Sequence, residues 1–218
     1  MTWIDQSLGS IARQLAGATA VFHQHNLDFC CGGNISLRDA AARGGHDAQA
    51  IAEQLQHLKT FADSGEVNWA ATGTPALVEH ILKRFHDKHR EQLPELIRLA
   101  RRVEAVHGER SDCPHGLADL LEQIEQEMLS HMAKEEQILF PLLLKGMGAM
   151  AVGPISVMRF EHDQHGENLR RLGEMTDQFQ PPRAACTTWR ALYLGLKTFR
   201  DDLMEHIHLE NNILFVAA

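Results

Sequence analysis

Apolar residues recur at helical spacing over four long segments of the chain, and none of these segments shows the strict alternation that is typical of a strand. The segments are 75–106, about 114–144, 154 to just before 181, and 187 or 188 almost to the C-terminus. Each is roughly 25 to 30 residues long, which corresponds to about 40 Å of α-helix. Helices of this length that are joined by short loops favour an antiparallel four-helix bundle.

The first part of the chain has shorter helical patterns, and a glycine-rich stretch, CCGGN at 30–34, separates them. The stretch FADSGEVNWAATGTP at 61–75 has turn-forming residues and no sustained period, as is typical of a linker. The sequence therefore predicts an all-α protein. We expect a small N-terminal helical domain over 1–60, a linker over 61–75 and a four-helix bundle over 76–218.

One motif occurs twice within the bundle segments. HMAKEEQILF at 131–140 and HIHLENNILF at 206–215 share the pattern His-x-x-x-Glu-x-x-x-Leu-Phe. A His-Asp pair precedes each copy at nearly the same distance, with its histidine at His86 and at His162. The sequence thus contains two copies of one helical-hairpin pattern, and side chains that can bind a metal occupy equivalent positions in both copies.

The duplicated hairpin predicts a metal site in the bundle interior. His and Glu four residues apart lie on one helical face, and arms of matched length bring the histidines to the same height. Buried carboxylates must be paired or coordinated, and mixed imidazole and carboxylate ligands suit iron, manganese or zinc. Four histidines and two glutamates are too many for one ion and suit two ions that share carboxylates. The candidate ligands are His86, His131, Glu135, His162, His206 and Glu210.

The repeat also favours one way to share these ligands. We expect His86 and His131 on one metal and His162 and His206 on the other, with both glutamates bridging. Other histidines, such as His89, His165 and His208, are expected to face solvent or to pack at the flanks of helices. For His89 and His165, each three residues after a candidate ligand, the alternative is a role in supporting the ligands. Two cysteines, Cys113 and Cys186, lie at the hairpin loops and receive no role.

Charge and composition exclude several classes of function. The net charge is −8, the isoelectric point is near 5.9, and no run of Lys or Arg forms a basic stripe, so no nucleic-acid partner is expected. No apolar stretch approaches the ~20 residues of a membrane span, so no membrane partner is expected. The first residues lack the basic and apolar regions of a signal peptide, so no secretory signal is expected. Four cysteines do not make a disulfide framework in a chain of 218 residues. A reducing cytoplasmic location is therefore expected.

Several motifs resemble a hemerythrin-type di-iron bundle, and more narrowly the repair-of-iron-centres family, the YtfE and ScdA group. The similar stretches are HDKHREQLPEL at 86–96, SHMAKEEQILFP at 130–141, GPISVM at 153–158, EHD at 161–163, HIHLENNILF at 206–215 and LDFCCGG at 27–33. The resemblance implies two non-haem iron ions with an oxo bridge, held by the six candidate ligands. It also implies damaged iron–sulfur proteins as clients, and nitric oxide or dioxygen as small ligands.

Three further residues gain candidate roles from this resemblance. Glu161 resembles a family acidic residue that lines a channel to the metals. Cys30 and Cys31 are candidates for redox chemistry or iron transfer, with packing of a tight turn as the structural alternative. The implied function is repair of iron–sulfur clusters after nitrosative or oxidative damage. The alternatives are a di-iron nitric oxide reductase that forms nitrous oxide and a sensor or carrier of dioxygen or nitric oxide. The sequence does not decide whether the metal is iron or manganese, whether the protein is an enzyme, or whether it forms a homodimer.

Overall fold

The computed structural model describes residues 3–15, 17–60 and 68–217, and within them the regular structure is helical. An isolated bridge between Ser7 and Ser36 is the one β-type pairing in this part of the chain. The expected all-α fold is confirmed. The chain divides into two compact units, Met1–Val78 with Met204–Ala218, and Glu79–Leu203.

Short helices form the N-terminal part of the first unit, and their ends follow local capping rules. They are η1 (Trp3–Asp5), α1 (Leu8–Gln14), α2 (Ala18–Gln24), α3 (Leu37–Gly44) and α4 (Ala48–Thr60). Ser7 and Ser36 cap α1 and α3, because each hydroxyl accepts a hydrogen bond from a backbone N–H three residues on. The helices enclose a buried apolar core that includes Leu8, Ile11, Phe22, Phe29, Leu37 and Leu55.

The CCGG loop depends on a glycine at its last position. A Cβ atom built on Gly33 would lie 2.3 Å from the backbone oxygen of Phe29, and the Gly33 carbonyl accepts a hydrogen bond from the N–H of Gly9 at 2.7 Å. A side chain here forces the loop backbone to move. Glycine is therefore required at position 33 for a steric reason, whatever the role of the two cysteines.

Replacing Gly33 by alanine is expected to destabilise the protein by about 2 kcal/mol or more, a size typical of changes that strain the backbone. Urea denaturation followed by circular dichroism measures the change. The matched control is Gly153→Ala on a helix, where a Cβ atom meets nothing within 4 Å. That change is expected to alter the stability by less than about 0.5 kcal/mol. Equal stability of the two variants would contradict the steric argument.

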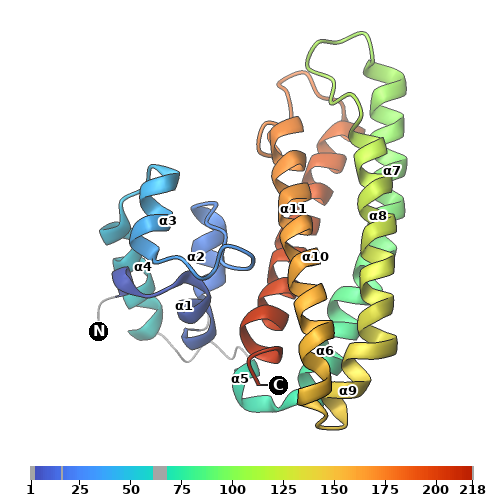
Figure 1. Cartoon of the computed structure of the whole chain (residues 1–218). Coiled ribbons are helices and arrows are strands. Elements are labelled where there is room, and N and C mark those ends of the chain that lie inside the picture. Colours follow the sequence, from blue (N-terminus) through green and yellow to red (C-terminus); the bar gives the residue numbers. More distant parts are fainter. Residues whose placement is uncertain (1–2, 16, 61–67, 218) are drawn as a thin grey trace. The chain divides into compact units, whose positions relative to one another are not determined.

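Residues 61–67 of the expected linker lie outside the described residues, and the part after them contains α5 (Trp69–Thr72) and the start of α6 (Thr74–Ile81). Four long helices then run side by side in Figure 1. They are α7 (Asp87–His107), α8 (Leu117–Lys134), α10 (Gly148–Met175) and α11 (Thr187–Leu209), and the short α9 (Phe140–Leu144) precedes α10.

Polar contacts show which bundle helices are neighbours. Arg101 of α7 pairs with Glu122 of α8 at 2.6 Å, and Asn168 of α10 donates to Glu127 of α8 at 2.7 Å. The ring of Phe199 on α11 lies 5.4 Å from that of His89 on α7. These contacts place α8 between α7 and α10, and α7 beside α11.

The start expected for the third bundle helix is wrong. We expected this helix to begin near Pro154, but α10 begins at Gly148 and Pro154 lies inside it. Proline removes one backbone donor, so the carbonyl of Met150 has no helical partner from that position. Met150 is 61% exposed, and water can therefore hydrate that carbonyl at little cost.

Three of the segments expected to be continuous helices are interrupted by a turn of π-helix. These turns are η2 (Leu82–His86), η3 (Glu135–Leu139) and η4 (Glu210–Leu214), and each contains a candidate ligand at one end. The N–H groups of Asp87, Phe140 and Phe215 bond to the carbonyl five residues earlier. One extra residue in a turn rotates the rest of the helix by about 100°, and such turns are frequent at functional sites.

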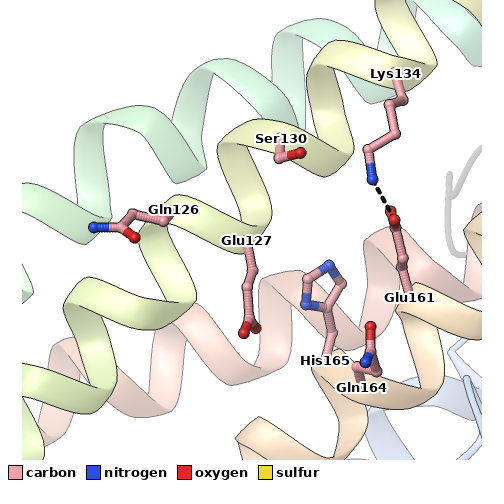
Figure 2. Close-up of a pocket in the computed structure, with 7 residues that line it drawn as sticks. All are labelled: Gln126, Glu127, Ser130, Lys134, Glu161, Gln164 and His165. Atoms are coloured by element: carbon pink, nitrogen blue, oxygen red, sulfur yellow. Dashed lines mark hydrogen bonds and ion pairs between the residues drawn. The ribbon is translucent and has the colours of Figure 1, made fainter.

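A polar cleft of about 280 Å³ opens between α8 and α10 (Figure 2). Lys134 and Glu161 form an ion pair across it, and the His165 ring points into it between the two helices. The lining residues are Gln126, Glu127, Ser130, Lys134, Glu161, Gln164 and His165.

Candidate metal centre

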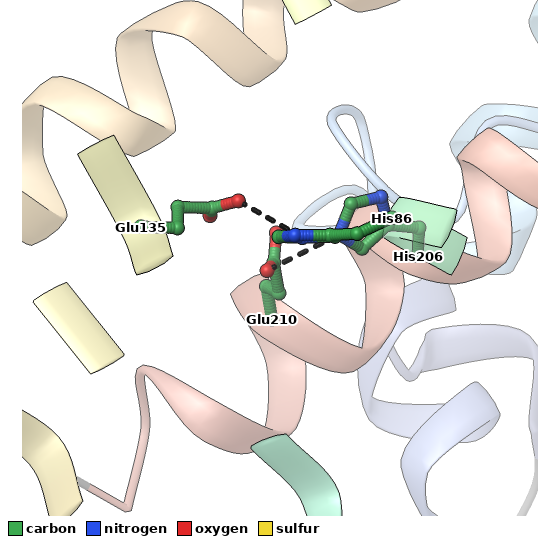
Figure 3. A group of neighbouring side chains, drawn as sticks. All are labelled: His86, Glu135, His206 and Glu210. Carbon is green, nitrogen blue, oxygen red and sulfur yellow. Dashed lines mark ion pairs between the residues drawn. The ribbon is translucent and has the colours of Figure 1, made fainter. Parts of the chain in front are cut away.

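The six histidines and glutamates of the duplicated motif form two overlapping groups. In each group four side chains bring ligand atoms within 4.8 Å of one another. The first group is shown in Figure 3. Its members are His86, Glu135, His206 and Glu210, and those of the second are His131, Glu135, His162 and Glu210. Both glutamates, Glu135 and Glu210, thus belong to both groups.

Distances within the groups show how the side chains converge. The two carboxylate oxygens of Glu135 face different histidines, with Oε2 at 3.3 Å from His86 Nε2 and Oε1 at 3.4 Å from His131 Nε2. His206 Nε2 lies 3.3 Å from Oε1 of Glu210. All of these side chains are at least 98% buried. Neutral imidazole nitrogens and carboxylate oxygens so arranged are a donor set for a divalent or trivalent transition metal.

The pairing of histidines that we expected from the repeat is wrong. His86 shares a group with His206, and His131 shares the other group with His162. The Nε2 atoms of His131 and His162 lie only 3.2 Å apart, so both nitrogens point to the same place in the second group. The repeat makes His86 equivalent to His162 and His131 to His206, and both pairings obey that two-fold relation. Which histidines meet depends on which helices face each other at the site.

Carboxylates outside the two groups orient two of the histidines. Nδ1 of His86 lies 2.8 Å from Oε1 of Glu136, and Nδ1 of His131 lies 2.9 Å from Oε2 of Glu161. A carboxylate accepts, so each imidazole carries its proton on Nδ1 and presents the Nε2 lone pair to the group interior. A cation backs each carboxylate, Arg90 on Glu136 at 2.6 Å and Lys134 on Glu161.

These contacts keep both outer carboxylates ionised. Hydrogen bonds from His131 and Lys134 lower the pKa of Glu161 to about 2, although partial burial raises it. Burial raises the pKa of Glu136, but hydrogen bonds from His86 and Arg90 outweigh it and hold this pKa below its usual value. Both groups therefore carry their charge at neutral pH. Glu161, expected beside a channel, lines the cleft of Figure 2 and contacts His131.

The chain matches known proteins over nearly its whole length. Residues 77–218 match the hemerythrin HHE cation binding domain, and residues 4–59 match ScdA_N, a domain of unknown function. The chain is 50% identical to the iron–sulfur cluster repair protein YtfE of Yersinia pseudotuberculosis serotype IB (strain PB1/+), and equally to those of Yersinia pestis (strain Pestoides F) and Dickeya chrysanthemi (strain Ech1591). Each alignment covers 100% of this chain and 98% of the relative.

The chain belongs to the YtfE family. The resemblance seen in its motifs is therefore confirmed, and the cation-binding domain of the family is the part that carries both buried groups. No helix in the described ranges is long and apolar enough to cross a membrane.

Loss of the carboxylate behind one histidine is expected to weaken metal binding in this YtfE-family chain. Replacing Glu136 by alanine removes the acceptor that orients His86. Changes at such outer positions cost about 10- to 100-fold in metal affinity. Competition with a chromogenic iron chelator measures the affinity. The control is Glu95→Ala, an exposed glutamate whose partner is Arg98. An affinity unchanged by loss of Glu136 would show that the contact does not orient the ring.

Three histidines that we expected at solvent or at helix flanks are buried instead. His89, His165 and His208 are at most 3% exposed. Burial lowers the pKa of His165 well below its usual value and that of His208 to about 4. All three lie two or three residues from a candidate ligand, on helices whose inner face is already buried. The helical turns that bury the candidate ligands thus also bury neighbouring histidines that are not among these candidates.

Cys30 and Cys31 lie in a turn that Asp28 organises. Oδ1 of Asp28 accepts hydrogen bonds from both cysteine N–H groups, at 3.1 and 3.0 Å, and from the Cys30 thiol at 3.2 Å. The Sγ atoms are 3.7 Å apart, and the three side chains form a third group with metal-binding spacing. The Cys31 thiol, burial and the Asp28 carboxylate raise the pKa of Cys30 well above its usual value.

The C-terminal residues of the same unit hold this turn. Asn211 donates to the Cys30 carbonyl at 3.5 Å, and Asn212 donates to the Phe29 carbonyl at 3.3 Å. Both asparagines follow Glu210 directly in the second copy of the repeat. In the first copy the position of Asn211 is taken by Glu136, so this pair of residues breaks the symmetry of the repeat.

Proposed function

We propose that this protein repairs iron–sulfur clusters damaged by nitric oxide or oxidative stress, and that it does so with two non-haem iron ions joined by an oxo bridge. The observation that carries the proposal is the pair of buried groups that share both glutamates, in a chain aligned end to end with iron–sulfur cluster repair proteins. The proposed ligands are His86, His206, His131, His162, Glu135 and Glu210.

The donor set fits two irons for a chemical reason. Each group offers two imidazole nitrogens and access to both carboxylates, which leaves an iron ion short of six protein ligands. Thiolates, which soft metals prefer, are absent from both groups. Iron held by these residues would supply redox and Lewis-acid chemistry. The protein residues supply a fixed geometry, two ionised outer carboxylates and exclusion of water.

We further propose that the cleft between α8 and α10 is the access route to this centre. Glu161 faces the cleft and also contacts His131, so one side chain links the opening to a ligand. The walls of the cleft carry two carboxylates, Glu127 and Glu161, against the single ammonium group of Lys134, and this excess of negative charge favours the passage of cations. Residues Gln126, Ser130 and Gln164 add neutral polar groups to the walls. The cleft thus suits a small polar ligand or an iron ion in transit.

Cys30 and Cys31 are proposed to act in transfer, either of iron or of oxidising equivalents. Their spacing with Asp28 supports a transient metal position of sulfur and oxygen ligands. The N-terminal domain over 1–60 would then serve the transfer step and the bundle over 76–218 the iron centre. The four cysteines, none of which is in a disulfide, support a reducing, cytoplasmic location.

Cluster repair in vitro tests the function. A [4Fe–4S] dehydratase is damaged with nitric oxide, and the iron-loaded protein is then added without oxygen, with a thiol reductant present. Recovery of dehydratase activity and cluster absorption is expected to exceed that given by the same amount of free ferrous iron. The Glu135→Gln variant is expected to match buffer alone. Recovery no better than with free iron would overturn the proposal.

Headspace gas chromatography of the reduced protein with nitric oxide distinguishes the alternative enzyme. The repair function predicts at most one stoichiometric event of nitrous oxide formation for each di-iron centre. Nitrous oxide formed in repeated cycles, together with failure to restore the dehydratase, would assign the protein as a reductase instead.

A further inference from the structure

A thiol and an imidazole meet at the loop end of the unit Glu79–Leu203. His107 ends α7, and Cys186 directly precedes α11. The Nε2 atom of His107 lies 3.2 Å from the Sγ atom of Cys186, and both side chains are partly exposed. An imidazole at this distance is placed to accept the thiol proton when the sulfur reacts as a nucleophile.

Aromatic packing fixes this pair in place. The His107 ring lies 5.2 Å from the fully buried Trp189 ring, with an angle of 35° between the planes. Arg110 lies over the same indole at 5.2 Å and donates to the carbonyl of Ala184, two residues before the cysteine. The base is therefore held by the bundle core, and the loop that carries the nucleophile is tied to it.

The pair opens into a pocket of about 150 Å³. Its walls combine apolar surface from Val103 and Val106 with the methyl-bearing side chain of Thr188. Arg102 also lines the pocket, and this exposed guanidinium has no ion-pair partner within the described part of the chain. Nucleophile, base, cation and apolar wall thus surround one small space.

We propose that Cys186 is a site of reversible modification by a low-molecular-weight disulfide with anionic groups, of the glutathione class. The Cys186 thiol loses its proton to Nε2 of His107, and the thiolate attacks one sulfur of the disulfide. A new S–S bond forms to Cys186 and the S–S bond of the reagent breaks. The leaving thiolate takes the proton from His107, so the protein sulfur is oxidised and the leaving sulfur is reduced. Arg102 pairs with a carboxylate of the bound reagent.

Two of the other thiols, Cys113 and Cys30, provide an internal comparison. Burial, together with Glu104 and Asp112, raises the pKa of Cys113, and the surroundings of Cys30 raise its pKa well above the usual value. Both are also buried. Cys186 differs from them in having a histidine at hydrogen-bond distance and a pocket at its sulfur. None of the residues of this site is a proposed iron ligand, so the inference stands apart from the proposed function.

Timed reaction with oxidised glutathione tests the proposal. The full chain is incubated with the reagent, quenched by acid, digested and analysed by mass spectrometry for the adduct on each cysteine. Modification of Cys186 is expected to be faster than that of Cys113 by about tenfold or more, and His107→Gln is expected to remove most of this advantage. Equal rates at the two thiols, or an unchanged rate in the His107 variant, would overturn the proposal.

A second pair of variants keeps the test independent of folding defects near Trp189. Arg102→Gln is expected to slow the reaction with oxidised glutathione and to leave the reaction with cystamine, a cationic disulfide, unchanged or faster. The control is Arg101→Gln, the neighbouring arginine, which pairs with Asp119 and Glu122 and does not line the pocket. The same effect of both arginine variants, or no effect of either, would show that the pocket does not select an anionic reagent.

Discussion

Replacing Glu135 by glutamine is expected to abolish binding at both iron positions, because this carboxylate belongs to both buried groups. Its two oxygens face His86 on one side and His131 on the other. An amide keeps the size of the side chain but loses the negative charge and offers only one oxygen. The iron content per chain, measured by mass spectrometry, is expected to fall more than about tenfold after dialysis against a weak chelator.

The repeat supplies an internal check on this result. Glu210 occupies the equivalent position in the second motif, and Glu210→Gln is expected to give the same loss at both positions. The control is Glu122→Gln, a glutamate on α8 that pairs with Arg101 at 42% side-chain exposure. This control is expected to keep its full iron content. A Glu135 variant that keeps two irons would show that the carboxylate does not bridge.

The second large effect is expected from pairs of histidine substitutions. His86→Ala combined with His206→Ala removes both imidazoles of one group and leaves the other group intact. This double variant is expected to keep about one iron per chain. His86→Ala combined with His131→Ala takes one imidazole from each group and is expected to keep much less. Mössbauer spectroscopy of iron-57 samples counts the remaining sites.

The single substitutions serve as controls for the doubles. His86→Ala and His206→Ala are expected to give the same residual spectrum, because both leave the position of His131 and His162 intact. The reverse outcome, with one iron kept after loss of His86 and His131, would restore the pairing that the repeat suggested. Circular dichroism of each variant separates loss of metal from loss of fold.

Much of the fold can be predicted from hydrophobic periodicity, and most of the candidate site from the repeat. The expected segment 75–106 corresponds to α6, η2 and α7, and the segment from 114 to 144 corresponds to α8, η3 and α9 with an end at Leu144. The six residues proposed as ligands come together because a helix places His131 above Glu135, and His206 above Glu210, on one inner face.

Other features have no signal in a single sequence. Two of the π turns begin at Glu135 and Glu210. The residue types within them are ordinary in α-helices and do not indicate that the turn contains an extra residue. Glu136 directly follows a ligand on the chain and reaches His86 on another helix, so only the tertiary structure reveals the contact. The partner of each histidine likewise depends on which helices face each other, and both pairings have the same sequence pattern.

Two features near the loops also have no signal in the sequence, for a physical reason. Cys186 lies in a hairpin connection, and its proximity to His107 requires two helix ends to meet across the bundle. The early start of α10 depends on a carbonyl that water can reach, which the position of Pro154 in the sequence does not reveal.

The measurement that tests the central claim most directly is the metal content of untagged protein by mass spectrometry, together with its visible absorption spectrum. The duplicated site predicts two iron ions per chain and the bands of an oxo-bridged diferric centre. One metal ion per chain, or zinc or manganese in place of iron, would contradict the di-iron centre, although the duplicated helical hairpin would remain as a structural repeat.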